Sequence, residues 1–225
     1  MAKQHASKNK KCWFAESCDL TTQCFCKRYE CLKWQMDNSG LPVAKQKPVK
    51  MFIMDENKAD EKAYKQLNSI RENIDDFVRK GENLYLCSQN VGNGKTSWAI
   101  RMLHTYFALT AENSYERLRG VFVSVPNLFV DLRDFESNVI NAEYRKLLYD
   151  VDLVVWDDIA ITGMTEYQYL QLYTFINNRV FAEKSNIFTS NVTQLEDLQD
   201  IVGQRIASRA YNMSLVVELV GADVR

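Results

Sequence analysis

The residues best suited to chemistry form a glycine-rich run in the middle of the chain. Residues 88–96 have the sequence SQNVGNGKT, which fits the phosphate-loop pattern G-x-x-x-x-G-K-[ST] with Gln89 in place of the first glycine. Glycines in such a loop let backbone N–H groups approach phosphate oxygens, and the start of the following helix favours negative charge. The run predicts a nucleotide site formed by Asn90, Val91, Gly92, Asn93, Gly94, Lys95, Thr96 and Ser97.

Two side chains in this run have predicted roles with ATP and Mg²⁺. Lys95 supplies a point charge to the β- and γ-phosphates, and Thr96 presents a hydroxyl to the metal ion. The plain alternative is a glycine-rich turn that only ends a strand. An apolar run precedes the loop and a helical pattern follows it, and this context favours nucleotide binding.

A pair of carboxylates follows another apolar run, in the sequence VVWDD at residues 154–158. Asp157 fits the residue that holds Mg²⁺, usually through water, and Asp158 fits the base that orients or activates the attacking water. Two aspartates also begin many ordinary turns, which is the competing interpretation. Because the same chain carries a phosphate loop, we interpret both residues as catalytic.

Two further positions are candidates for contact near the γ-phosphate. The strand predicted at 186–190 is followed by Asn191, the first candidate for a side chain that holds the attacking water, with Ser190 in reserve. Arg205 and Arg209 are one helical turn apart and share a face. Arginines at this spacing usually form a solvated face, but in a ring or filament one of them can reach the γ-phosphate of a neighbour.

These residues need elements that position them, and the sequence predicts an α/β fold. Buried strands that alternate with helices are typical of a parallel sheet covered on both faces. The five predicted strands are 83–87, 120–125, 152–156, 186–190 and 214–219. The predicted helices are 61–80, 96–109, 127–135, 142–149, 165–181, 195–198 and 203–211.

The cysteines suggest a separate metal site near the start of the chain. Five of the six lie between residues 12 and 31, in a segment with too few apolar residues to form its own core. In a reducing compartment clustered cysteines more often bind metal than form disulfides, and four thiolates suit tetrahedral Zn²⁺. Cys31 lies in a helical pattern and is an alternative ligand or a packing residue, while Cys87 is expected to be inert in a core strand. Unrelated thiols and an iron–sulfur cluster are the competing interpretations. The predicted zinc ligands are Cys12, Cys18, Cys24 and Cys26.

Composition and charge divide the 225-residue chain into three predicted parts. Residues 1–38 form the cysteine-rich zinc module, 39–60 a linker and 61–225 the nucleotide-binding domain. The net charge of −1 excludes a strongly basic protein, but residues 1–50 carry a local +6, which is typical of a contact module joined to an acidic body. No signal peptide and no membrane-spanning apolar stretch is visible, so we expect a cytoplasmic protein.

Four of these segments together resemble the DnaC/DnaI-type helicase loaders, a family of AAA+ ATPases, with phage and mobile-element members most similar. They are residues 90–96, WDDI at 156–159, TSN at 189–191 and the helix at 205–209. The resemblance covers residues 61–225 well and the cysteine-rich start loosely. It implies that Asn191 is the first sensor and Arg209 an arginine finger.

The same resemblance implies an activity and partners. It implies ATP hydrolysis with Mg²⁺, delivery of the replicative hexameric helicase to single-stranded DNA, and self-association through contacts made by Arg209. Some loaders of this family carry a zinc-binding N-terminal module, which favours Zn²⁺ at the cysteines. The predicted fifth strand ends six residues before the last residue. An AAA+ core without a C-terminal lid, and weak intrinsic hydrolysis, are therefore expected.

Three other functions stay open. A transposition ATPase of the IstB type would act on duplex DNA together with a transposase, and the zinc-like start favours a loader over it. A nucleotide-dependent adaptor would inhibit a helicase without hydrolysing ATP. A small-molecule kinase is disfavoured by the twin aspartates and by the arginine-bearing helix.

Overall fold

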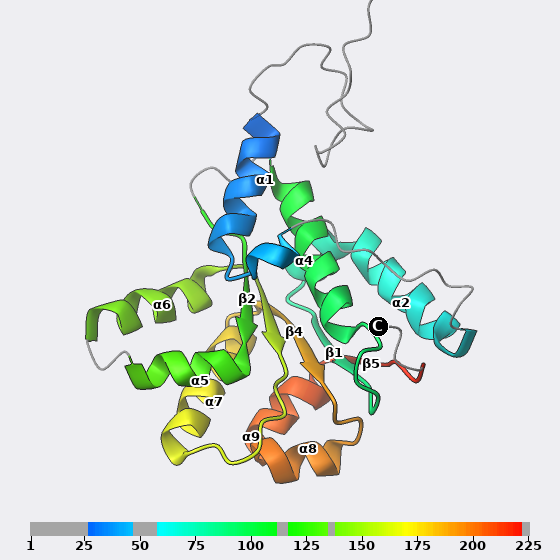
Figure 1. The fold of residues 1–225 in the computed structure, drawn as a ribbon, viewed down its shortest axis with the longest axis vertical. Coiled ribbons are helices and arrows are strands. Elements are labelled where there is room, and N and C mark those ends of the chain that lie inside the picture. The colour runs from blue at the N-terminus through cyan, green and yellow to red at the C-terminus, as the bar shows by residue number, and fades with distance from the viewer. Residues whose placement is uncertain (1–26, 47–57, 112–116, 135–137, 222–225) are drawn as a thin grey trace, which may run out of the picture.

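The strands of the chain form one parallel sheet. The computed structural model describes residues 27–46, 58–111, 117–134 and 138–221. Within these ranges five strands lie in the order β2-β3-β4-β1-β5 (Figure 1), so the predicted five-stranded parallel α/β sheet is confirmed. The strands are β1 (Asn83–Cys87), β2 (Gly120–Ser124), β3 (Leu153–Asp157), β4 (Ser185–Ser190) and β5 (Leu215–Glu218).

Helices cover both faces of this sheet (Figure 1). Successive side chains of a strand point to opposite faces, and in β1 Leu84 and Leu86 join one hydrophobic cluster while Tyr85 and Cys87 join another. Helices α1 to α4 contribute to the first cluster and α5 to α9 to the second. None of the described helices is both long and apolar enough to cross a membrane. The helices are α1 (Lys27–Asn38), α2 (Glu61–Glu72), α3 (Ile74–Arg79), α4 (Lys95–Thr110), α5 (Val125–Asp134), α6 (Asn138–Asp150), α7 (Glu166–Phe181), α8 (Leu195–Val202) and α9 (Gln204–Ala207).

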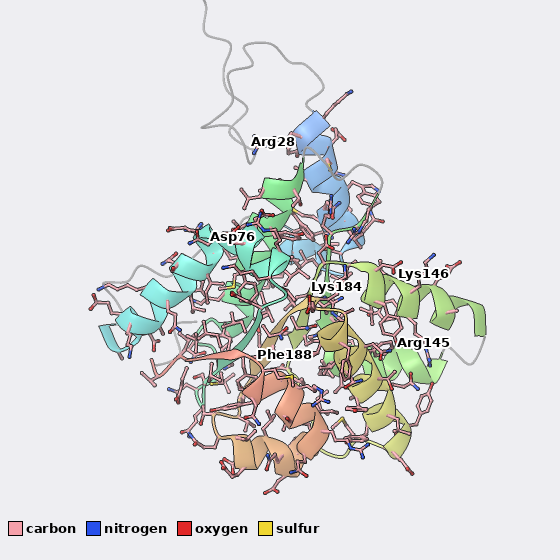
Figure 2. The ribbon with its side chains drawn as sticks, turned by 180° about the vertical axis from the view of Figure 1, so that it is seen from behind. Arg28, Asp76, Arg145, Lys146, Lys184 and Phe188 are labelled. Carbon is pink, nitrogen blue, oxygen red and sulfur yellow. The ribbon has the colours of Figure 1, made fainter. Side chains whose placement is uncertain are left out.

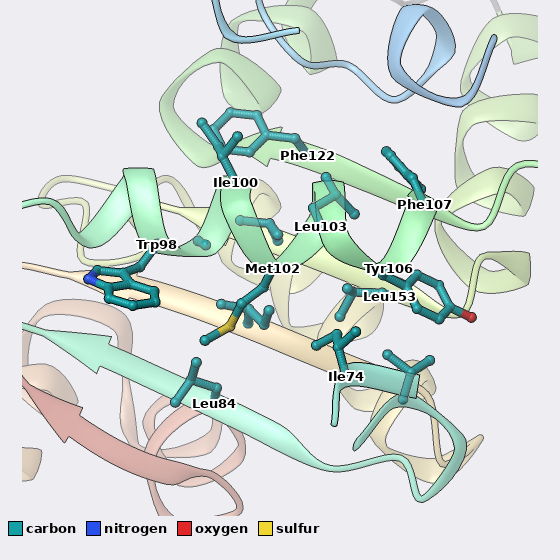
Figure 3. Packing of buried hydrophobic residues seen from close by; sticks show 14 of the residues in the cluster. Ile74, Leu84, Trp98, Ile100, Met102, Leu103, Tyr106, Phe107, Phe122 and Leu153 are labelled. Atoms are coloured by element: carbon teal, nitrogen blue, oxygen red, sulfur yellow. The ribbon is translucent and has the colours of Figure 1, made fainter. Parts of the chain in front are cut away.

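Helix α4 directly follows the phosphate loop and fills the centre of one layer. Trp98, Met102 and Leu103 are buried in a cluster that includes Leu84 of β1 and Leu153 of β3 (Figure 3). Burying one side chain of this size typically contributes about 1.5–3 kcal/mol. The packing therefore fixes where the first turn of α4, which carries the site residues, lies on the sheet.

Two predicted helices are divided in the structure. The helix predicted at 61–80 is interrupted at Asn73, where φ is −109° and ψ is 28°, so the backbone leaves the helical range. The Asn73 side chain donates to the Ser69 carbonyl at 2.8 Å. The helix predicted at 203–211 consists of α9 and a π-helical turn at Ser208–Asn212. Competing side-chain bonds and irregular turns of this kind leave little trace in apolar periodicity.

Helix α1 packs against the body of the molecule. Its Gln35 side chain is buried, accepts a hydrogen bond from the Arg119 N–H at 2.8 Å and donates to the Arg117 carbonyl at 2.8 Å. The next residues bind the edge of β2, where the Phe122 N–H donates to the Ser39 carbonyl at 2.7 Å. The predicted zinc module 1–38 thus includes a helix, α1, that belongs to the layer covering the sheet, and the bounds of the module stay a prediction.

A buried arginine joins the ends of the strands opposite the phosphate loop. All five N–H donors of Arg179 are satisfied, by the Asn186 side chain and by backbone carbonyls at the end of α6 and the starts of β3 and β4. Close by, Lys184 (Figure 2) donates to Asp152 at 3.1 Å. Arginine is suited to this place because lysine has no planar fork of donors. The network holds β3 and β4 in register, and their other ends carry the candidate site.

Candidate active site

The phosphate loop lies between the end of β1 and the start of α4, as predicted. Gly92 and Gly94 have φ values of 84° and 97°, which residues with side chains rarely adopt. Among the described residues Gln89 does not have a positive φ, so the backbone does not require glycine there. Val91 is exposed and Ser97 is half-buried in the first turn of α4, and their roles with nucleotide stay predictions.

The Lys95 side chain is folded against the loop that precedes it. The lysine is 7% exposed, and its Nζ donates to the Asn90 carbonyl at 3.0 Å and to Asn93 Oδ1 at 3.4 Å. Ammonium groups are strongly hydrated and are rarely buried without oxygen partners. The loop therefore holds a desolvated cation next to its own backbone, which is an arrangement suited to anionic oxygens.

Three oxygen-bearing side chains from different elements meet at the edge of the sheet. The Thr96 hydroxyl of α4 donates to Asp157 Oδ1 at the end of β3 at 2.8 Å, and the Thr189 hydroxyl of β4 donates to the same oxygen at 2.7 Å. Burial raises the pKa of Asp157 above its ordinary value, while the two hydroxyls and Lys95 oppose the rise. A half-buried carboxylate that accepts from two hydroxyls, in the electrostatic field of a lysine, is typical of a metal or phosphate site.

Thr189 is the site residue that sequence reasoning missed. It belongs to the predicted strand-end segment, but Asn191 and Ser190 were the candidates there. Strand β4 lies between β1 and β3, and its pairing with β3 ends at Trp156 opposite Phe188. Thr189 therefore stands next to Asp157. The signal depends on strand order and register, which the residues of β4 do not reveal by themselves.

Asp158 occupies an unusual backbone conformation at the turn after β3. Its φ is 56°, a left-handed value that aspartate tolerates better than most residues. Its N–H donates to the Thr189 hydroxyl at 3.0 Å, and its side chain is exposed. The turn thus separates a half-buried carboxylate, Asp157, from an exposed one, which suits different roles for the two residues.

The two sensor candidates differ in their surroundings. Asn191 is exposed directly after β4 ends, as its predicted role requires. Ser190 is buried, its carbonyl accepts from the Ser88 N–H at 3.2 Å, and its hydroxyl accepts from the Val192 N–H at 3.0 Å. These contacts give Ser190 a structural role in the turn, and Asn191 stays the sensor candidate.

Both candidate arginines lie against α7. The guanidinium of Arg205 stacks over the Tyr173 ring at 5.8 Å from the centroid, and that of Arg209 over the Phe181 ring at 6.0 Å. Arg209 Nε also donates to Asn177 Oδ1 at 3.2 Å. The two arginines share one face, as predicted, and aromatic side chains hold both of them on the surface.

The cysteine predictions fall mostly outside the described residues. Cys12, Cys18, Cys24 and Cys26 all precede α1, so zinc binding stays a prediction. Cys31 is 1% exposed in α1 and packs in the core cluster of α4. Burial raises the pKa of Cys87 to about 12, which keeps this thiol protonated and inert. Within the described ranges no cluster of three or more metal-binding side chains is present.

Comparisons with known proteins identify similar structures. No protein-family model and no curated protein sequence matches this chain. A DnaC helicase loader is 17% identical with a TM-score of 0.58, over 83% of this chain and 98% of that chain. A DnaI structure is 20% identical with a TM-score of 0.53, over 69% of this chain and 84% of that chain.

The replication initiator DnaA is similar over a shorter part of its length. Its structure bound to AMPPCP and single-stranded DNA is 21% identical with a TM-score of 0.57, over 71% of this chain and 46% of that chain. At identities this low, the structural matches show a shared fold and nothing more. The chain therefore shares its fold with the DnaC and DnaI helicase loaders and with the DnaA initiator.

Proposed function

We propose that this protein binds and hydrolyses ATP and acts as a loader of the replicative helicase. The observation that carries the proposal is the contact of Asp157 with Thr96 and Thr189, where Thr96 directly follows the loop cation Lys95 in the chain. Three elements that are distant in sequence place a hydroxyl, a carboxylate and a second hydroxyl at one point. A turn that merely ends a strand has no need of such a cluster.

Thr96 and Asp157 are suited to holding Mg²⁺. Both present hard oxygen donors, 2.8 Å apart, and Mg²⁺ in nucleotide sites is usually held by one or two carboxylates together with waters and phosphates. The single carboxylate of Asp157 is therefore enough to hold Mg²⁺ together with Thr96, waters and phosphates. When bound, the ion would neutralise charge on the phosphates and would oppose the rise in the pKa of Asp157 that burial causes.

The other residues have distinct roles in this proposal. Lys95 exchanges its contacts with the loop for phosphate oxygens of ATP, and Asp158 orients the attacking water and accepts its proton. Asn191 holds the same water from the neighbouring strand end. Arg209 of a second copy reaches the γ-phosphate, so hydrolysis depends on self-association and is weak in the isolated chain.

The loader function is supported by the kinds of protein that share the fold. DnaC and DnaI structures match this chain, and the matching DnaA structure holds AMPPCP and single-stranded DNA. We assign single-stranded DNA and the replicative hexameric helicase as partners. The N-terminal segment 1–50 is the proposed contact with the helicase, because it carries a local +6 on an otherwise acidic chain.

Zinc in this segment is a separate part of the proposal, with its own measurement. Metal analysis of the purified protein should find about one zinc per chain, since four thiolates form one tetrahedral site. Changing Cys18 and Cys24 to serine should remove it, whereas Cys87→Ser, outside the cluster, should leave it in place. Iron, or no metal, would reject the zinc site without affecting the ATP site.

A loading assay tests the main proposal. The replicative helicase of the native host is mixed with circular single-stranded DNA, which a closed ring cannot thread, and the helicase retained on the circle is measured. We expect retention to rise when this protein and ATP are both present, and not with Lys95→Ala. A protein that binds the helicase but never raises retention, and hydrolyses no ATP, would instead be an inhibitor.

A further inference from the structure

The backbone segment that follows β5 is attached to the phosphate loop. Asn90 Nδ2 donates to the carbonyls of Val220 and Gly221 at 3.1 and 2.9 Å. Asn93 Nδ2 donates to the Leu219 carbonyl at 3.1 Å. Both asparagines occupy variable positions of the loop pattern, so the pattern itself does not require these bonds. The loop thus has a second attachment besides β1 and α4.

A buried carboxylate holds the same segment from its other side. Asp60 is 1% exposed, and its Oδ1 accepts from the Val220 N–H at 2.6 Å. The Gly221 N–H donates to both carboxylate oxygens of Asp60, at 3.2 and 3.1 Å. Although Asp60 stands at the N-cap of α2, its side chain makes no capping hydrogen bond. Its carboxylate is instead directed to Val220 and Gly221, which lie 160 and 161 positions later in the chain.

The loop cation is connected to this arrangement. Lys95 Nζ donates to the Asn90 carbonyl and to Asn93 Oδ1, so each asparagine binds Lys95 through an oxygen and the segment after β5 through its Nδ2. Asp60, residues 219–221, the two asparagines and Lys95 form one continuous hydrogen-bonded chain. Groups connected in this way act together rather than independently.

We propose that Asp60 is a positioning residue for the phosphate loop. It fixes residues 219–221, these fix the side chains of Asn90 and Asn93, and the loop is thereby held in the shape that accepts phosphate. Residues 219–221 lie between Asp60 and the loop asparagines, so Asp60 acts on the loop through this segment and not by contact with the nucleotide. This inference rests on the proposed ATP binding, and it adds a determinant of affinity outside the loop pattern.

The expected effect is on binding rather than on the chemical step. A loop that is already ordered loses less conformational entropy when ATP arrives. Without Asp60 the segment is released on one side and the loop must be ordered by the nucleotide. Loss of charge-assisted bonds of this kind is expected to weaken ATP binding about tenfold. The turnover rate at saturating ATP should stay within about twofold, because bound ATP restores the loop.

The test measures the affinity of the full-length protein for a fluorescent N-methylanthraniloyl-ATP with Mg²⁺. Asp60→Ala and Asn90→Ala should each bind about tenfold more weakly than the wild type. Asp60→Asn keeps an oxygen at the Oδ1 position and should recover most of the affinity. Glu61→Ala is the matched control, because Glu61 adjoins Asp60 but pairs with Lys65 on the protein surface.

The double variant Asp60→Ala/Asn90→Ala separates positioning from two unrelated losses. If both residues act through residues 219–221, the double variant binds about as weakly as either single one. If the double variant instead loses affinity by the product of the two single losses, or if Asp60→Ala keeps full affinity, the positioning role is overturned, while ATP binding by the wild type stands. If Asp60→Ala does not fold, as thermal unfolding without nucleotide would show, the test rests on Asn90→Ala, and full affinity of Asn90→Ala overturns the role. A wild type that does not bind the probe would instead refute the proposed function.

Discussion

Two regions of this molecule differ in how many parts of the chain build them. One is the nucleotide cluster, formed by Lys95, Thr96, Asp157 and Thr189, and the other is the arginine face, formed by Arg205 and Arg209. In the cluster Lys95, Thr96 and Asp157 are half-buried or buried and bind one another or the loop. On the arginine face Arg205 and Arg209 make their cation–π and side-chain hydrogen-bond contacts with one helix, α7. One region is assembled from the phosphate loop, α4, β3 and β4, whereas the other presents cations on a surface.

In the proposed function this difference would separate ATP binding from ATP hydrolysis. A single chain already holds the groups that would bind ATP and Mg²⁺. Its candidate finger is held by Asn177 and Phe181 rather than by the loop. We therefore expect binding to be a property of one chain and hydrolysis a property of an assembly, in which the arginine face of one copy meets the nucleotide cluster of the next.

The largest expected effect comes from removing the finger. Arg209→Ala should bind ATP as tightly as the wild type but hydrolyse it roughly 10³–10⁵ times more slowly in the presence of DNA and helicase. The guanidinium no longer meets the charge that builds on the γ-phosphate. Arg205→Ala, one turn away and stacked on Tyr173, is the control and should keep most of the rate. Normal turnover by Arg209→Ala would return this residue to being a surface charge.

A somewhat smaller loss is expected at the exposed carboxylate. Asp158→Asn should bind ATP normally and lose about 10²–10⁴ in turnover, the usual contribution of a positioned base. Its backbone bond to Thr189 does not involve the side chain, so the turn should persist. Single-turnover hydrolysis measures the chemical step directly. Full activity would move the base to another residue.

The loop lysine should affect binding before it affects rate. Lys95→Ala removes the only side-chain cation of the loop and should weaken ATP affinity about a hundredfold or more, since charge-assisted contacts to phosphate are lost. Equilibrium titration with a fluorescent nucleotide gives the value. An unchanged dissociation constant would refute the assignment of the phosphate loop.

The smallest expected effect concerns Phe181, whose ring packs against the Arg209 guanidinium. Phe181→Leu keeps an apolar side chain but removes the ring over which Arg209 lies, and should slow hydrolysis about two- to fivefold, as expected for an exposed cation–π contact. Tyr173→Leu removes the equivalent ring under Arg205 and should leave the rate unchanged. Equal losses in the two variants would mean that α7 supports both arginines only structurally.

Local patterns were sufficient to predict the strands and the loop. The glycines at 92 and 94 mark left-handed backbone, and β1 is a continuous buried run, so both features can be recognised within a few residues. The helix predicted at 165–181 begins with Thr165, which caps α7 in a capping box with Gln168. Each of these features is determined by neighbours in the sequence.

Features that depend on distant parts of the chain could not be predicted. Thr189 joins the site only because β4 lies between β1 and β3, and Asp60 matters only because its carboxylate meets Val220. Strand register and long-range hydrogen bonds depend on the complete fold, so no local sequence pattern identified these residues.

Mixing two inactive variants tests the central claim most directly. Arg209→Ala keeps its phosphate loop and Lys95→Ala keeps its finger, so a mixed contact can join an intact loop to an intact Arg209. We predict that the mixture, with single-stranded DNA and helicase present, hydrolyses ATP clearly faster than either variant alone. If sedimentation shows that the two variants assemble together and the mixture still has no activity, the nucleotide site is not completed by a second copy.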